Sequence, residues 1–76
     1  MNLAHKDNYI ELGLNIAYYR KRSSLTQKEL ARKIGANMSF ISKIETATVG
    51  VSLDKLFAIS EALGIPPSLL LKFRED

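Results

Sequence analysis

The sequence predicts an all-α fold, a compact bundle of five short helices. Apolar residues recur at spacings of three or four along most of the 76-residue chain, as they do on the buried face of a helix. Candidate N-cap residues, glycines and prolines separate these stretches, and none of them makes a convincing strand. The connections are only a few residues long, which suits neighbouring helices. We therefore expect a single domain over residues 1–76.

The first helix is expected over residues 8–22, with Asp7 as its N-cap. Its predicted buried residues are spaced three or four apart: Tyr9, Leu12, Ile16 and Tyr19. A second apolar stripe falls on the opposite face and consists of Ile10, Leu14 and Tyr18. Such a stripe on a surface helix favours a partner-binding surface, although single exposed apolar residues are common.

The second and third helices are expected to meet at Gly35. Thr26 and Glu29 have the spacing of a capping box, which places the start of the second helix at Thr26. Gly35 is a natural left-handed terminator for that helix. Asn37 is a favoured N-cap for the third helix. The residues expected to face the core are Leu30, Ala31, Ile34, Phe40, Ile41 and Ile44.

The last two helices are expected to begin at Ser52 and at Pro67. The fourth helix should end at Gly64, and its predicted buried residues are Leu53, Leu56, Ile59 and Leu63. Proline suits the first turn of a helix, so the fifth should begin at Pro67. It is expected to continue through Leu69, Leu70 and Leu71.

Positive charge is concentrated in the middle of the chain. The segment 20–43 contains seven basic residues and one acidic residue, so its charge is +6, whereas the whole chain carries +3. A solvated face is one explanation of such a segment. The other is a surface that binds a polyanion, most often a nucleic acid.

Composition excludes several other classes of function. The chain has no cysteine, so it has no disulfide and no thiolate metal site. No apolar run approaches the roughly 18 residues that a membrane span requires. His5 has no partner at a useful spacing, and no pair of carboxylates suggests acid–base chemistry. We therefore expect a cytoplasmic protein that is not an enzyme and that uses no metal or cofactor.

Two helices joined by about three residues around a glycine are typical of a helix-turn-helix, here over about residues 26–45. The small side chain of Ala31 lets the two helices approach closely, while Ile41 and Ile44 anchor the third helix. This arrangement leaves an outward face on that helix made of Met38, Ser39, Ser42 and Lys43. In a helix-turn-helix, residues near the start of the second helix meet base edges in the DNA major groove.

Nearly the whole chain beyond about Tyr9 resembles the Cro/cI-type repressor domains, also called the Xre family. The matching residues are Leu12-Gly13, Ile16, Arg20, LTQKELARKIG at 25–35, FISKIE at 40–45, SLDKL at 52–56 and ALGI at 62–65. The resemblance implies the lambda-repressor-like fold and a small, dimeric bacterial or phage transcription regulator. Such a regulator binds double-stranded DNA at a palindromic operator, as a repressor or autoregulator.

The resemblance also implies roles for individual residues. The base-contacting positions are Met38, Ser39, Ser42 and Lys43. The phosphate-binding positions are Thr26, Gln27, Lys28, Asn37 and Thr46. Arg20 and Glu45 match a pair that forms a partly buried ion bridge in relatives, so Arg20 is expected to be structural.

The chain departs from the family in two loops and in the second apolar stripe of its first helix. Relatives often have glycine where Ser24 stands. They commonly have Arg-Gly followed by a basic residue after the third helix, whereas residues 46–51 here read TATVGV and carry no charge. Fewer phosphate contacts would flatten the salt dependence, although backbone N–H groups can still reach a phosphate. Controller proteins often open this helix with Arg-Thr-Tyr, where Met38-Ser39-Phe40 stands here.

Specific binding by so small a module usually requires two copies, on half-sites about 34–36 Å apart. The preferred dimer surface is the last helix with Leu69, Leu71 and Phe73; the alternative is the stripe of Ile10, Leu14 and Tyr18. An alternative function is a protein-interaction module or antitoxin, which uses the same fold mainly to bind a partner. The uncharged loop and the apolar stripe favour that alternative, whereas the basic segment and Lys43 favour DNA.

Overall fold

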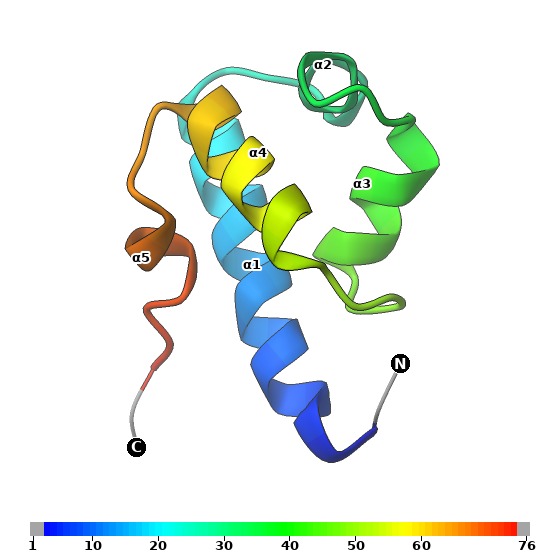
Figure 1. The fold of residues 1–76 in the computed structure, drawn as a ribbon, viewed down its shortest axis with the longest axis vertical. Helices are drawn as coiled ribbons and strands as arrows, with labels where there is room; N and C mark the ends of the chain where they lie inside the picture. The colour runs from blue at the N-terminus through cyan, green and yellow to red at the C-terminus, as the bar shows by residue number, and fades with distance from the viewer. Residues whose placement is uncertain (1–2, 75–76) are drawn as a thin grey trace.

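A computed structural model describes residues 3–74 and confirms the all-α fold (Figure 1). Within these residues the chain forms a short 3-10 helix and five α-helices, and no strand. The elements are η1 Leu3–His5, α1 Lys6–Arg22, α2 Gln27–Lys33, α3 Met38–Glu45, α4 Leu53–Leu63 and α5 Pro67–Leu70. Within residues 3–74, no helix combines the length and the apolar character that crossing a membrane requires.

The N-cap predicted for the first helix is wrong. Helix α1 begins at Lys6, directly after η1, and His5 occupies the N-cap position without a side-chain hydrogen bond. Asp7 lies inside the first turn, because the preceding 3-10 turn already sets the chain on its helical course. Its carboxylate there still complements the positive end of the helix dipole.

Helix α4 follows the prediction at both ends but not over its whole buried face. The Ser52 hydroxyl accepts a hydrogen bond from the Lys55 N–H, and Gly64 ends the helix with φ +68°. Leu53, which was expected to be buried, is 64% exposed because the first turn of α4 lies at the margin of the core. The expectation for Leu53 was therefore wrong.

Helix α5 is a single turn that ends at Leu70, so the predicted continuation through Leu71 is wrong. Leu71 is the C-cap, and its N–H bonds to the Ser68 carbonyl. The chain beyond it is held by Asn15 of α1. The Asn15 side-chain amide donates to the carbonyls of Leu70 and Lys72, at 2.9 and 3.1 Å.

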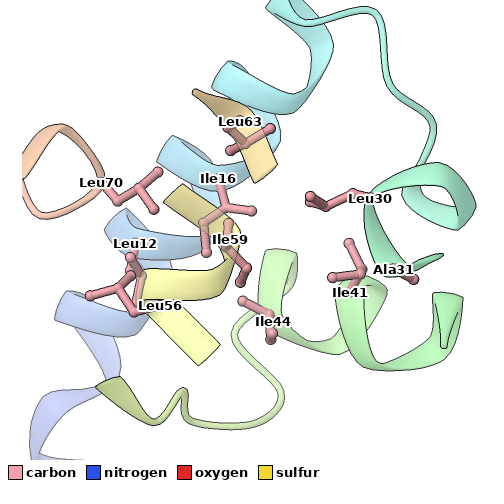
Figure 2. Packing of buried hydrophobic residues seen from close by; sticks show 10 residues of the cluster. All are labelled: Leu12, Ile16, Leu30, Ala31, Ile41, Ile44, Leu56, Ile59, Leu63 and Leu70. Atoms are coloured by element: carbon pink, nitrogen blue, oxygen red, sulfur yellow. The ribbon is translucent and has the colours of Figure 1, made fainter. Parts of the chain in front are cut away.

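One apolar core joins all five α-helices (Figure 2). Its buried members are Leu12, Ile16, Leu30, Ala31, Ile41, Ile44, Leu56, Ile59, Leu63 and Leu70. The remaining predicted core residues Tyr9, Tyr19, Ile34 and Phe40 are half-buried and pack against this cluster. In Figure 1, α1 runs through the centre of the bundle, with α3 on one side of the molecule and α5 on the other. Helix α3 is thus held from behind by the core and has one face free.

Candidate nucleic-acid interface

The joint between α2 and α3 is built by local hydrogen bonds that the sequence predicts. The Thr26 hydroxyl accepts from the Glu29 N–H at 3.0 Å, and the Thr26 N–H donates to the Glu29 carboxylate at 2.9 Å. Gly35 adopts φ +69°, and the Asn37 side chain accepts from the Phe40 N–H at 2.9 Å. Both helix starts and the turn between them are therefore fixed by the local sequence.

Helix α3 has one buried and one exposed face. Ile41 and Ile44 are fully buried against α2 and the core, where Ala31 is also buried. The opposite face presents the four residues predicted to contact bases. Met38 is 53% exposed, Ser39 and Lys43 are exposed, and Ser42 is half-buried. The structure thus brings all four together on one accessible surface.

Arg20 and Glu45 form a bidentate ion pair that joins α1 to the last residue of α3. The Arg20 Nε donates to Glu45 Oε2 at 2.7 Å, and its Nη2 donates to Oε1 at 3.0 Å. Their side chains are only 10% and 6% exposed. The Arg20 Nη1 also donates to the Leu25 carbonyl, at 2.8 Å. Arg20 is consequently a structural residue and is not available to DNA.

Gln27 connects this ion pair to the start of α2. Its side-chain nitrogen donates to Glu45 Oε1 at 2.9 Å. A primary amide has two N–H donors, so one of them is satisfied within the protein and the other can bind an external acceptor. Gln27 therefore braces the end of α3 and retains the donor that a phosphate contact needs.

Gly13 determines how closely α1 approaches α3. A Cβ atom at this position would lie 2.6 Å from the Ile44 carbonyl oxygen and 2.7 Å from that of Glu45. These are backbone atoms, so they cannot move without displacing α3. The two helices can pack at this distance only because residue 13 has no side chain.

The uncharged loop after α3 folds back onto that helix. The Thr46, Ala47 and Thr48 N–H groups donate to α3 carbonyls at 3.0, 3.1 and 2.8 Å. The Thr46 hydroxyl donates to the Ser42 carbonyl at 2.8 Å and also pairs with the Thr48 hydroxyl. The expectation that backbone N–H groups of the loop reach a phosphate is therefore wrong for these three residues.

Two features of this loop escape sequence inspection. Ala47 adopts φ +58° although its side chain is buried, and the Lys6 ammonium donates to its carbonyl at 3.0 Å. The α1–loop contact links residues 41 positions apart, so no local signal predicts it. The Arg-Gly that the resemblance implies after the third helix is compatible with this left-handed backbone, because glycine adopts positive φ without strain.

The basic segment is mostly accessible. Once Arg20 is set aside, its exposed members are Lys21, Arg22, Lys28, Arg32, Lys33 and Lys43. Lys28 and Arg32 border a shallow groove between α2 and α3, which Asn37 and Met38 also line. Positive charge thus lies directly beside the exposed face of α3.

The candidate partner surfaces lie away from α3. Leu71 is exposed, whereas Leu69 and Phe73 are half-buried. Leu71 and Phe73 line an apolar groove together with Val51, Leu53 and Leu56. The exposed Leu53 and Phe57 extend this apolar surface along α4, which sequence inspection missed because Leu53 has helical spacing to the buried Leu56. The α1 stripe of Ile10, Leu14 and Tyr18 is also exposed, and its Ile10 end lines a pocket with Phe73.

Comparison with known proteins places the chain among regulators. A family model described as "Helix-turn-helix" matches residues 16–70. The control protein C.BamHI of Bacillus amyloliquefaciens is 42% identical over 52 residues, which cover 68% of this chain and 64% of that protein. An uncharacterized helix-turn-helix transcriptional regulator of Methanocaldococcus jannaschii is 31% identical over 61 residues, covering 80% of this chain and 92% of the regulator.

The fold is also shared with a solved controller protein. The restriction-modification controller protein C.AhdI from Aeromonas hydrophila has a TM-score of 0.84 with this structure at 27% identity. The match covers 87% of this chain and 96% of that one. Since the family model spans well over half of the chain, the protein belongs to the helix-turn-helix family of DNA-binding transcription regulators, which are not enzymes.

Proposed function

We propose that this protein binds double-stranded DNA sequence-specifically, as a homodimer that places α3 of each copy in the major groove of a palindromic operator. The observation that carries the proposal is the exposed face of α3, which the core, Gly13 and the Arg20–Glu45 pair hold in one orientation. A surface that must align with base edges gains from such rigidity, because the side chains then reach the bases without further ordering cost.

Each residue of this face has a distinct chemistry toward bases. The Lys43 ammonium can donate to O6 or N7 of guanine. The Ser39 and Ser42 hydroxyls can each donate or accept. Met38 has no hydrogen-bond donor and suits apolar contact with a thymine methyl group. We therefore assign base contacts to these four residues, with Lys43 as the principal determinant.

The predicted phosphate contacts differ in how many donors they keep. Asn37 uses only its side-chain oxygen in the N-cap, so its amide N–H₂ remains available. Gln27 retains one N–H, and Lys28 is exposed beside the α2–α3 groove. The Thr26 hydroxyl accepts in its capping box, and a phosphate would have to share its proton with the Glu29 carboxylate. Thr46 contributes least, because its hydroxyl already donates to the Ser42 carbonyl.

A dimer would bury the apolar residues that are exposed on α4 and after α5. We call this the C-terminal surface, and it consists of Leu53, Phe57, Leu69, Leu71 and Phe73. Leu53, Phe57 and Leu71 are 64, 50 and 47% exposed, and the groove beside them is lined by Phe73. The half-buried Leu69 contributes from α5. A contiguous apolar surface of this kind is typical of an interface. Two copies related by a two-fold axis match the symmetry of a palindromic site.

The regulatory role that we propose is repression or autoregulation in the cytoplasm of a bacterium. Two of the similar proteins are described as a control protein and a restriction-modification controller protein, which supports a controller-type regulator. Occupancy of an operator would then depend on the concentration of the protein and on salt, since phosphate contacts release counterions.

The proposal is tested by selecting bound sequences from a random pool of duplex DNA. We expect an inverted repeat whose half-site centres lie about 10 base pairs apart, or a multiple of that spacing. Selection with a Met38→Ala/Ser39→Ala variant should change the preferred bases within each half-site without changing the spacing. Recovery of no enriched sequence by the unaltered protein would overturn the proposal.

A further inference from the structure

The apolar stripe on α1 belongs neither to the buried core nor to the DNA-binding face. Only its Ile10 end borders the C-terminal segment, where Ile10 lines a pocket with Phe73 and Arg74. Ile10, Leu14 and Tyr18 are 39, 54 and 54% exposed. Helices α3, α4 and α5 all pack on α1 and leave this face uncovered. Tyr18 is held in place by its neighbours, because its ring lies edge-on to Tyr19 at 5.0 Å and under the Arg22 guanidinium. The stripe is therefore a preformed surface.

The stripe is symmetric in sequence about Leu14. Ile10 and Tyr18 lie four residues to either side of Leu14, while Asp7 and Lys21 lie seven residues to either side. At about 100° per residue, all five fall within an arc of about 80° on the helix surface. A face with this symmetry is complementary to an antiparallel copy of itself, in which Leu14 packs against Leu14.

Charge favours the same arrangement. One end of the stripe carries Asp7, with Glu11 beside it, and the other end carries Lys21, with Arg22 beside it. Asp7 and Lys21 are both exposed, and neither forms an ion pair within residues 3–74. An antiparallel copy places each Asp7 against the Lys21 of its partner, whereas a parallel copy places like charges together. The helix dipoles also run in opposite directions in this arrangement.

We infer that α1 forms a second, self-complementary contact between copies of this chain, with the two α1 helices antiparallel and Leu14 on the two-fold axis. Three side chains with two flanking ion pairs form a surface much smaller than the roughly 800 Å² per partner of a stable complex. The contact is therefore weak and joins copies at high local concentration. Leu14 and Tyr18 line neither of the pockets that Phe73 borders, and only the Ile10 end of the stripe meets the proposed C-terminal dimer surface. The two contacts together can therefore link one dimer to the next.

A single cysteine tests this geometry, because the chain contains none of its own. When two helices pack with their axes about 8–10 Å apart, the Cα atoms of the two copies of residue 14 face each other across the two-fold axis. They then come within about 4.4–6.8 Å, which is the range that a disulfide requires. We expect Leu14→Cys to form a covalent dimer under mild oxidation at least about tenfold faster than Glu61→Cys, an exposed control on α4. Equal rates for the two variants would overturn the inference.

Charge reversal on the Leu14→Cys background separates this contact from non-specific collision. Asp7→Lys and Lys21→Asp should each slow the cross-linking about three- to tenfold, because like charges then meet at both ends. Mixing the two variants should restore the rate in the mixed dimer, where every pair is again opposite in charge. A mixture no faster than either variant alone would contradict the antiparallel arrangement.

The same assay distinguishes this contact from the C-terminal one. Leu71→Glu on the Leu14→Cys background should disrupt the proposed C-terminal dimer and leave the α1 cross-linking rate unchanged. A rate that falls with Leu71→Glu would show that the thiols meet only through that dimer, and would overturn the inference. Circular dichroism confirms that each variant is folded before its rate is compared.

Discussion

Arg20 of α1 holds Glu45 of α3 through two parallel hydrogen bonds, of 2.7 and 3.0 Å, in a largely buried position. Gln27 at the start of α2 adds a third hydrogen bond to the same carboxylate. One carboxylate thus connects α1 to α2 and α3, the two helices that carry the proposed DNA interface. Glu45 is the last residue of α3, so the carboxylate fixes that end of the helix against α1 and α2.

Removing the carboxylate should be costly because it leaves the Arg20 guanidinium buried without its partner. We expect Glu45→Ala to lower the free energy of unfolding by about 3 kcal/mol, measured by urea denaturation. Arg22→Ala, which removes an exposed arginine from α1, the helix that carries Arg20, should change the free energy of unfolding by less than about 0.5 kcal/mol. The double variant Arg20→Met/Glu45→Leu should lose less than Glu45→Ala, since no unpaired charge remains. Similar losses for Glu45→Ala and Arg22→Ala would contradict this account.

Ser24 offers a stabilising substitution because its backbone is left-handed. It adopts φ +58° and its side chain is exposed. Glycine relieves a cost of about 1–2 kcal/mol at such a position and loses part of that gain to its larger unfolded-state entropy. We expect Ser24→Gly to raise the free energy of unfolding by about 0.5–1 kcal/mol. Ser23→Gly is the matched control, since Ser23 has φ −85° and should gain nothing. Equal effects at the two serines would refute the explanation.

The capping box at α2 should make stability depend on pH in the acid range. Two groups of Thr26 hold the pKa of Glu29 below its ordinary value of 4.5. The larger effect comes from the hydrogen bond of the Thr26 backbone N–H, and the smaller one comes from the Thr26 hydroxyl. A lowered pKa in the folded state stabilises the fold above pH 4.5, and this contribution is lost as the pH falls through the folded-state value. Glu29→Gln keeps a side chain suited to the box but does not titrate. Its unfolding free energy should therefore fall less than that of the unaltered protein between pH 5 and 3, and parallel curves would contradict this assignment.

The uncharged loop after α3 should limit binding to random DNA. Thr48 is exposed in this loop, and Thr48→Lys adds a charge that can reach a phosphate. We expect the slope of log K against log salt on random duplex DNA to steepen by about 0.9 per bound chain. Ser68→Lys adds the same charge on α5, away from α3, and should leave the slope unchanged. If both variants steepen the slope equally, the loop does not face DNA.

The sequence predicted the parts of this structure that depend on neighbouring residues. The capping box of Thr26 and Glu29, the left-handed Gly35 and the caps Asn37 and Ser52 are all local, and each is confirmed. The five helices and most of the core follow from spacing in the same way.

The features that sequence could not predict depend on distant packing. Leu53 has the spacing of a buried residue, but no other helix covers the first turn of α4 on that side within the described chain. The hydrogen bond from Lys6 to the Ala47 carbonyl joins the start of α1 to the loop after α3. These two segments are far apart in the sequence, and only the fold brings them together. The start of α1 was missed because η1 leads into it without a side-chain cap. Helical spacing predicted which four residues form the exposed face of α3. It does not predict which bases those side chains contact.

The central claim is that the exposed face of α3 contacts bases, and Lys43 tests it most directly. The measurement is the affinity of Lys43→Ala for the selected operator and for random duplex DNA at one salt concentration. Loss of a base contact costs about 1–3 kcal/mol per site, so the ratio of the two affinities should fall about tenfold or more. Lys33→Ala, which removes an exposed lysine from α2, should leave that ratio unchanged. An equal loss of affinity on both DNAs would contradict the account, because it would make Lys43 a phosphate contact.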